Sequence, residues 1–417
     1  MENIENDERA ERAVLVNIDT GEYDVDSSFD ELSELAETAG AEVVAVMSQK
    51  RDTPNAATFV GRGRLEELRV YCADNDIDLL IFDSELTPSQ QRNIEELTDV
   101  RVIDRTTLIL DIFAAHARSG EGKLQVEIAQ LKYTLPRLGG KGVQLSRLGG
   151  GIGTRGPGET KLETDKRHIR RRIKKLEDEL EALKKRRSLM RERRVKDRVT
   201  TAAIVGYTNA GKSTLMNALT NADVLAEDKL FVTLDPTARA LTLPSGRKIM
   251  LIDTVGLIRR LPHHLVEAFL STLEEAAAAD VILNVCDASS DECAEHLRVT
   301  DEILTELECT DKPIISVMNK CDLVKDAADI PAVGKSVMIS ALNGYGLQKL
   351  LDMIESVLPP TRREAEFLFP YSLSSAVAEL HRDGAVSIEE YREEGVYLKA
   401  VADISFIDRY KNCLIPK

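Results

Sequence analysis

The sequence predicts an α/β protein with four parts: an N-terminal parallel α/β domain, a long helical hairpin, a second domain with a mostly parallel sheet, and a small α+β C-terminal domain. Three observations lead to this prediction. Short apolar runs alternate with helical patterns over residues 13–118, two helical stripes flank a glycine-rich stretch, and the alternation returns from Thr200. We expect an acidic tail followed by four domains, with bounds at 1–12, 13–120, 121–198, 199–360 and 361–417.

The first domain is predicted from four apolar runs of strand length, separated by helical spacing. A helix start is marked by Thr87-Pro88, because proline is tolerated in the first turn, where its missing N–H would have no partner. The expected strands are 13–18, 42–47, 79–82 and 100–103, and the expected helices are 30–39, 65–73 and 89–97. Strands that alternate with helices in this way form a parallel sheet.

The helical hairpin is predicted from apolar residues at 4-3-4-3 spacing in residues 123–138 and again in 169–183. Between the two stripes, residues 139–158 hold nine of the 24 glycines, a density that excludes a helix or a strand interior. We therefore expect two helices joined by a glycine-rich loop.

Charge is distributed unevenly along the chain. The net charge is −16, yet residues 132–198 carry 22 Lys and Arg against 9 Asp and Glu. Such a segment can be a solvated helical face with a plain linker, or it can bind the phosphate backbone of RNA. No aromatic residue lies in 134–198, so contacts would go to phosphates and sugars. The candidate RNA-binding residues are Arg137, Lys141, Arg147 and Arg155.

The second domain and the tail are predicted from the same patterns. The expected strands of the second domain are 202–205, 248–252, 281–287, 313–318 and 336–339, with helices at 213–219, 265–279, 294–307 and 347–357. Pro359-Pro360 ends the domain, because neither residue continues a helix. The tail is expected to hold one helix, 374–382, a turn at Asp383-Gly384, and two strands, 385–391 and 396–401.

Composition excludes several classes of protein. No run of about 18 uncharged apolar residues occurs, and the first eight residues are acidic where a signal peptide would be basic and then apolar. We expect a cytoplasmic monomer without a membrane span, with peripheral membrane association left open. The six cysteines form no C-x-x-C pair, so we expect packing residues, with neither a zinc site nor a disulfide framework.

Residues 206–213, GYTNAGKS, match the phosphate-loop pattern G-x-x-x-x-G-K-[ST] directly after a strand and at the start of a helix. Glycines let backbone N–H groups curl around phosphates, Lys212 supplies a point charge and the Ser213 hydroxyl ligates Mg²⁺. Asp253-Thr254-Val255-Gly256 follows the next strand; Asp253 would hold Mg²⁺ through water and the Gly256 N–H can sense a γ-phosphate. We assign catalytic roles to Lys212, Thr233 and Gly256.

The base is predicted from Asn319-Lys320-Cys321-Asp322, since a carboxylate accepts two hydrogens from the guanine edge and adenine offers no such pair. Guanine nucleotides, GTP and GDP, are therefore the expected ligands, and Ser340-Ala341 would back the base. The nucleotide-binding candidates are Gly206, Tyr207, Thr208, Asn209, Ala210, Gly211, Lys212, Ser213, Thr214, Phe231, Val232, Thr233, Asp253, Thr254, Val255, Gly256, Asn319, Lys320, Asp322, Ser340, Ala341 and Leu342. The metal candidates, for Mg²⁺, are Ser213, Thr233 and Asp253.

A switch loop is expected between the first two motifs, where a threonine must reach Mg²⁺ and the γ-phosphate. Thr233 is the first choice and Thr237 the alternative. Leu257 follows Gly256 where many GTPases have a glutamine that orients the attacking water, so slow intrinsic hydrolysis is predicted, on the order of 10⁻⁴ to 10⁻² per second. His263, His264 and His296 are expected at the surface.

The chain resembles the HflX family of translation-factor-related GTPases over nearly its full length. The motifs are residues 206–214, 231–237 and 253–256, and, outside the GTPase domain, 104–106, 121–127 and 149–160. The resemblance implies a ribosome-associated GTPase that binds the large ribosomal subunit and ribosomal RNA through its N-terminal region and hairpin, with hydrolysis stimulated by the ribosome. Some members split ribosomes under stress, and ATP use is also attributed to the family. Leu257 departs from the family's usual Phe.

Two alternatives stay open. One is a nucleotide-regulated RNA-binding or ribosome-assembly factor in which hydrolysis only ends a binding state. The other is an ATP-driven RNA remodeller that uses residues 1–198 for its nucleotide. It is disfavoured because Gly61-Arg62-Gly63 is too short for a phosphate loop and is better explained as a turn before a helix.

Overall fold

The computed structural model of this 417-residue chain describes residues 9–138, 157–196, 199–220, 230–231, 237–260, 275–309, 311–324, 334–360 and 362–415. It divides into two compact units, residues 1–355 and 356–417, each of which is described by itself. Every helix in the described part of the chain is too short or too polar to cross a lipid bilayer.

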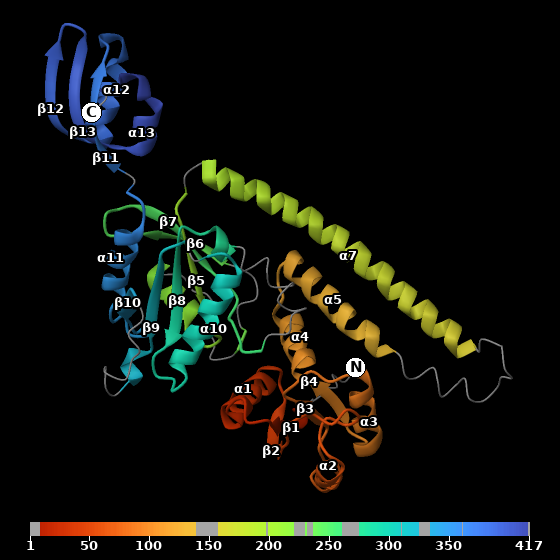
Figure 1. Ribbon diagram of the computed structural model, residues 1–417. Coiled ribbons are helices and arrows are strands. Elements are labelled where there is room, and N and C mark those ends of the chain that lie inside the picture. Colours follow the sequence, from red (N-terminus) through yellow and green to blue (C-terminus); the bar gives the residue numbers. More distant parts are fainter. Residues whose placement is uncertain are drawn as a thin grey trace, which may run out of the picture. The chain divides into compact units, whose positions relative to one another are not determined.

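The N-terminal domain is a four-stranded parallel sheet covered by helices on both faces. The strands lie in the order β2-β1-β3-β4. One face packs under α2 and α3, and the other under α1 and α4 (Figure 1), which explains why β3 and residues 13–16 of β1 are apolar. The elements are β1 Arg12–Asp19, α1 Val25–Thr38, β2 Glu42–Lys50, α2 Arg62–Asp74, β3 Leu79–Phe82, α3 Pro88–Thr98, β4 Arg101–Asp104 and α4 Arg105–His116.

All four predicted strands and three predicted helices of this domain are confirmed, and α3 begins at Pro88 with a capping box between Thr87 and Gln90. Helix α4 was not predicted. Its buried residues include Arg105, Thr106 and the consecutive apolar residues 108–110, so the sequence shows little helical periodicity. Its start is fixed by Asp104, whose carboxylate accepts a hydrogen bond from the Thr107 N–H.

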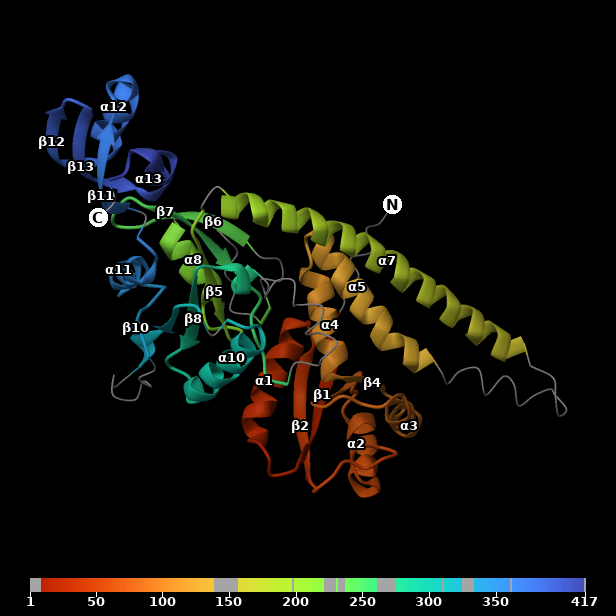
Figure 2. The same cartoon turned by 45° about the horizontal axis from the view of Figure 1, so that its top comes forward.

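A helical hairpin follows, as predicted. Helix α5, Gly120–Thr134, continues into a 3₁₀ turn, Leu135–Leu138, and lies alongside the 40-residue helix α7, Pro157–Lys196 (Figures 1 and 2). Ile173 and Leu176 from the predicted stripe are buried, whereas Leu189 and Met190 further along α7 are exposed. Ion pairs join the two helices at Glu121–Arg187, Glu127–Arg172 and Lys132–Glu177.

The second domain is a six-stranded sheet in the order β10-β9-β8-β5-β7-β6. Five strands are parallel, as predicted. The sixth, β6, was not predicted and runs antiparallel to β7 at the sheet edge, which is why its residues are largely exposed. The elements are β5 Thr201–Gly206, α8 Lys212–Thr220, β6 Thr237–Thr242, β7 Lys248–Asp253, β8 Val281–Asp287, α10 Cys293–Glu306, β9 Ile314–Asn319, β10 Ser336–Met338 and α11 Leu347–Val357.

The C-terminal unit has its own core around Phe367, Phe369, Leu398 and Phe406. Its antiparallel sheet has the order β11-β13-β12. The elements are β11 Arg362–Phe369, α12 Ser374–Asp383, β12 Ala385–Arg392, β13 Gly395–Asp403 and α13 Ile404–Arg409. The predicted helix and two strands are present, but the prediction missed β11 and α13, the strand and helix that complete the core.

Candidate nucleotide-binding site

The phosphate loop connects β5 to α8, and two of its glycines have no substitute. Gly206 has φ +148°, and a Cβ there would lie 2.1 Å from the Val285 carbonyl oxygen. Gly211 has φ +86°, and its Cβ would lie 2.3 Å from Asn319 Nδ2. Any side chain at either position would collide with the neighbouring strand ends, so the loop can pack this closely only with glycine.

Lys212 opens α8 with its amino group buried inside the loop. Its Nζ donates a hydrogen bond to the Tyr207 carbonyl oxygen at 2.6 Å. Burial lowers the pKa of Lys212 to about 8, and the Asp253 carboxylate opposes part of that shift. In the same loop, the buried Thr208 hydroxyl oxygen has no hydrogen-bond partner among the described residues. An anion bound in the loop would stabilise the charged Lys212 amino group and would offer the Thr208 hydroxyl a hydrogen-bond partner.

Ser213 and Asp253 meet next to the loop. The Ser213 hydroxyl donates to Asp253 Oδ2 at 2.9 Å, and Asp253 ends β7 fully buried. A hydroxyl and a carboxylate oxygen are hard donors of the type that a small divalent cation prefers. No cluster of three or more His, Cys, Asp or Glu that could hold a metal ion occurs in the described ranges.

The segment after Asp253 is bonded to the phosphate loop. The Thr208 N–H donates to the Leu257 carbonyl at 2.8 Å, and the Leu257 N–H donates to the Gly206 carbonyl at 3.0 Å. Between them, a Cβ on Gly256 would lie 2.6 Å from Thr208 Cγ2, so only glycine fits. The Leu257 side chain is buried and apolar, so it cannot orient a water.

The guanine motif lies at the end of β9, beside the loop. Asn319 Nδ2 donates to the Ala210 carbonyl, and Asn319 Oδ1 accepts from the Ala341 N–H, both at 2.9 Å. Asn319 therefore joins the phosphate loop to the loop predicted to back the base. Lys320 forms an ion pair with Asp287 at 2.7 Å, while Asp322 and Leu342 are exposed.

Other candidates lie elsewhere. Val232 and Thr233 fall outside the described residues, as do Lys141, Arg147 and Arg155. Phe231 packs edge-on against Phe113 of α4, with ring centroids 4.6 Å apart. Arg137 is directed into the N-terminal domain: its guanidinium donates to the Tyr133 and Leu86 carbonyls at 2.9 and 2.7 Å.

A contact between the nucleotide site and the N-terminal domain was missed by sequence reasoning. The Tyr207 hydroxyl of the phosphate loop bonds to Glu31 of α1 and accepts from the Arg259 N–H at 2.8 Å. Arg260 pairs with Asp83 at 2.8 Å, and Asp83 also pairs with Arg105 at 2.9 Å. Two sequence features lie at this contact: the adjacent pair of arginines after the Asp-x-x-Gly motif, and the 104–106 motif, which contains Arg105.

The surface expectation for His296 is wrong. Its ring stacks on Tyr207, with centroids 3.8 Å apart and planes 14° from parallel. Burial, followed by the nearby Arg259 charge, lowers the pKa of His296, so the ring is neutral near pH 7. The helical position that seemed solvent-facing is covered because the phosphate loop packs against α10.

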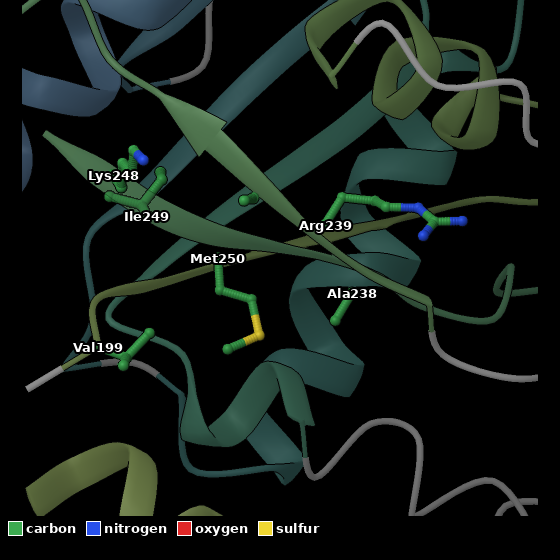
Figure 3. Close-up of a pocket in the computed structure, with 7 residues that line it drawn as sticks. Val199, Ala238, Arg239, Lys248, Ile249 and Met250 are labelled. Carbon is green, nitrogen blue, oxygen red and sulfur yellow. The ribbon is translucent and has the colours of Figure 1, made fainter. Parts of the chain in front are cut away.

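A separate hollow of about 460 Å³ lies against the β6–β7 hairpin (Figure 3). Met250 and Ala238 border it, whereas the Arg239 side chain extends away from Met250. None of the candidate nucleotide-binding residues lines it, so it is distinct from the motifs described above.

A phosphate loop followed by Asp-x-x-Gly and Asn-Lys-x-Asp, all at the carboxyl ends of parallel strands of one sheet, defines the class of P-loop guanine-nucleotide-binding proteins. Three family models match the chain: "GTP-binding GTPase N-terminal" over 26–114, "GTP-binding GTPase Middle Region" over 116–194, and "50S ribosome-binding GTPase" over 201–320.

The chain is 51% identical to GTPase HflX of Caldanaerobacter subterraneus over 97% of its length and 94% of the relative. It is 40% identical to GTPase HflX of Escherichia coli, covering 91% of this chain and 93% of that one. A solved GTP-binding protein from Sulfolobus solfataricus in complex with GDP is 29% identical, covering 83% of this chain and 98% of that one with a TM-score of 0.45.

The chain belongs to the HflX family of GTPases, and it binds and hydrolyses GTP. Family membership implies a divalent metal ion, which the Ser213 and Asp253 oxygens fit.

Proposed function

We propose that this chain is a Mg²⁺-dependent GTP switch that acts in the cytoplasm on the large ribosomal subunit and separates or rescues stalled ribosomes. The match of residues 201–320 to a family described as a 50S ribosome-binding GTPase carries the proposal. The uneven charge supports it: α7 has basic side chains exposed on its surface, as ribosomal RNA requires. These are Arg167, Arg170, Arg171, Lys174, Lys175, Lys185 and Arg186.

In this proposal the phosphates of GTP lie in the 206–213 loop, with Lys212 on the β- and γ-phosphate oxygens and the Gly256 N–H on the γ-phosphate. Asn319, Lys320 and Asp322 hold guanine, and Ser340, Ala341 and Leu342 form the loop behind it. Mg²⁺, held by Ser213, Asp253 and Thr233, would neutralise phosphate charge during hydrolysis.

Hydrolysis adds water to the γ-phosphorus as the bond to the β-phosphate oxygen breaks, releasing GDP and phosphate. Leu257 supplies no polar group for this water, so the intrinsic rate is slow and the ribosome must complete the site. Hydrolysis measured with and without large ribosomal subunits tests the proposal. We expect subunits to raise the rate by orders of magnitude; an unchanged rate would contradict it.

A second candidate function is a nucleotide-regulated RNA-binding or assembly factor, favoured by the same basic helix. Separated subunits would then accumulate equally with GTP and with a non-hydrolysable analogue. An ATP-driven remodeller with its nucleotide in residues 1–198 has less support, because Gly61 caps the start of α2 and its N–H donates to Gln49 Oε1 at 2.7 Å. That geometry is a turn before a helix. ATP hydrolysis, as a secondary activity, is assigned to the same phosphate loop.

A further inference from the structure

Two cysteines of the GTPase domain lie unusually close together. Cys286 is near the end of β8 and Cys293 opens α10, and their Sγ atoms are 3.0 Å apart. Both side chains are buried, at 1% and 4% exposure, in a small cluster with Leu297 and Met318. A distance shorter than ordinary sulfur contact means that little rearrangement separates two thiols from a bond.

The pair lies directly beside the guanine motif. In the β8–β9 ladder, Cys286 is opposite Met318 and Asp287 is opposite Asn319. The Ala288 N–H donates to the Asn319 carbonyl at 2.8 Å, and Asp287 holds Lys320. The turn between the two cysteines therefore supports the residues that recognise guanine.

We propose that Cys286 and Cys293 are a dithiol that a small hydroperoxide oxidises to an intramolecular disulfide beneath the guanine motif, and that this disulfide slows release of guanine nucleotide. The two sulfur atoms lie within hydrogen-bond distance, and the hydrogen bond with Cys286 lowers the pKa of Cys293, which favours Cys293 as the nucleophile. Burial excludes large disulfide oxidants, so a hydroperoxide is the fitting class.

The reaction balances in two steps. The Cys293 sulfur attacks one peroxide oxygen, the O–O bond breaks, and hydrogen peroxide gives a sulfenic acid and one water. The Cys286 sulfur then attacks the sulfenic sulfur, the S–O bond breaks, and the disulfide and a second water form. The two thiols lose two electrons and two protons, and the peroxide gains them.

The test treats the full-length, GDP-bound protein with hydrogen peroxide, followed by alkylation and peptide mass spectrometry. Both cysteines lie in one tryptic peptide, 261–298, and Cys309 lies alone in 299–320 as an internal control for a buried thiol. We expect peptide 261–298 to lose two hydrogens, to resist alkylation and to recover both thiols with dithiothreitol, while Cys309 stays alkylatable. A peptide that remains fully alkylatable, or that carries only over-oxidised Cys293, overturns the proposal.

Nucleotide release provides the second readout. Oxidised protein should release a fluorescent GDP analogue more slowly by a factor on the order of five, a modest coupling between sites. Cys293→Ala should show no peroxide effect, and Cys309→Ala, the matched control, should respond like the unmodified chain. If the oxidised protein, with its disulfide formed, released nucleotide at the same rate as the reduced protein, the proposal that the disulfide slows release would be wrong.

Discussion

The Lys212 amino group is buried, and burial disfavours its charged form. In the nucleotide-free protein, burial lowers its pKa to about 8, far below that of an exposed lysine. Bound phosphates stabilise the charged form, so binding above this pKa must take up a proton. Affinity for GDP should therefore fall as pH rises through 8, by roughly fourfold between pH 7 and pH 8.5.

Calorimetry of GDP binding in two buffers with different ionisation enthalpies measures this proton directly. Uptake should be small at pH 7 and should approach one proton at pH 8.5. Equal uptake at both values would mean that Lys212 keeps its proton in the free protein.

The second residue-scale prediction concerns Asp322. In the proposed site Asp322 accepts two hydrogens from guanine. Asp322→Asn would remove this acceptor, so affinity for GTP should fall by about 3 kcal/mol, roughly a hundredfold. The amide can donate to xanthine, which has an oxygen where guanine has an amino group, so xanthosine triphosphate should bind better to the variant than GTP does. Competition binding measures both. Asp311→Asn, at an exposed aspartate of the same domain, should change neither affinity.

At the scale of elements, the contact between the nucleotide site and the N-terminal sheet depends on a buried carboxylate. Burial raises the pKa of Asp83, and the Arg260 charge is the largest of the contacts that oppose the shift. Arg260→Ala leaves that carboxylate with less compensation and should cost about 2 kcal/mol of unfolding free energy. Adding Asp83→Asn should restore more than half of the loss.

Thermal and denaturant unfolding of the single and double variants measure this coupling, with Arg239→Ala as the exposed control. Additive losses in the double variant would show that Arg260 and Asp83 do not act as a pair.

The long helix α7 gives a prediction about RNA. Five exposed basic residues of α7 have no ion-pair partner among the described residues, and four of them lie together in the first half of the helix. Each charge that meets a phosphate releases counterions. Changing all four to Gln should weaken binding to large ribosomal subunits and reduce the slope of log affinity against log salt by about 3. The four are Arg167, Arg170, Arg171 and Lys174.

Filter binding over a salt series provides the measurement. The control removes the same charge from exposed positions of the GTPase domain, and its slope should stay unchanged. Its four substitutions are Arg239→Gln, Lys248→Gln, Lys335→Gln and Lys349→Gln. An equal loss of slope in both variants would indicate nonspecific attraction.

For the whole molecule, the two compact units predict that nucleotide binding resides in the first. The C-terminal unit has its own aromatic core, and every nucleotide candidate lies before residue 355. A chain ending at Pro360 should keep its affinity for GDP within a factor of about two. Calorimetry on the truncated and full chains checks this; a large loss would show that the C-terminal unit completes the site.

Sequence reasoning succeeded where local pattern and structure agree. The parallel strands are continuous apolar runs, and they could be predicted from the sequence alone. The phosphate-loop glycines could be predicted as well, because contacts that exclude a side chain require glycine at those positions. The pattern did not indicate α4, in which consecutive residues 108–110 are buried and weaken the helical periodicity, or β6, which is exposed at a sheet edge.

The contacts made by Tyr207 could not be predicted, because Glu31 and His296 come from elements 176 and 89 residues away along the chain. Tyr207 occupies a variable position of the phosphate-loop motif, where the motif specifies no residue type. Its importance arises only when the first domain and α10 are brought beside the loop. The same holds for Asp83, whose partners are distant in sequence.

Arg259 and Arg260 lie three and four positions after Gly256. Their side chains bind the first domain, Arg259 through a hydrogen bond to Ser27 and Arg260 through an ion pair with Asp83. In the proposed site the γ-phosphate would accept a hydrogen bond from the Gly256 N–H, only three residues before Arg259. A shift of Gly256 on binding GTP would therefore strain the contacts of Arg259 and Arg260 with the first domain, so the two domains would respond to the nucleotide together.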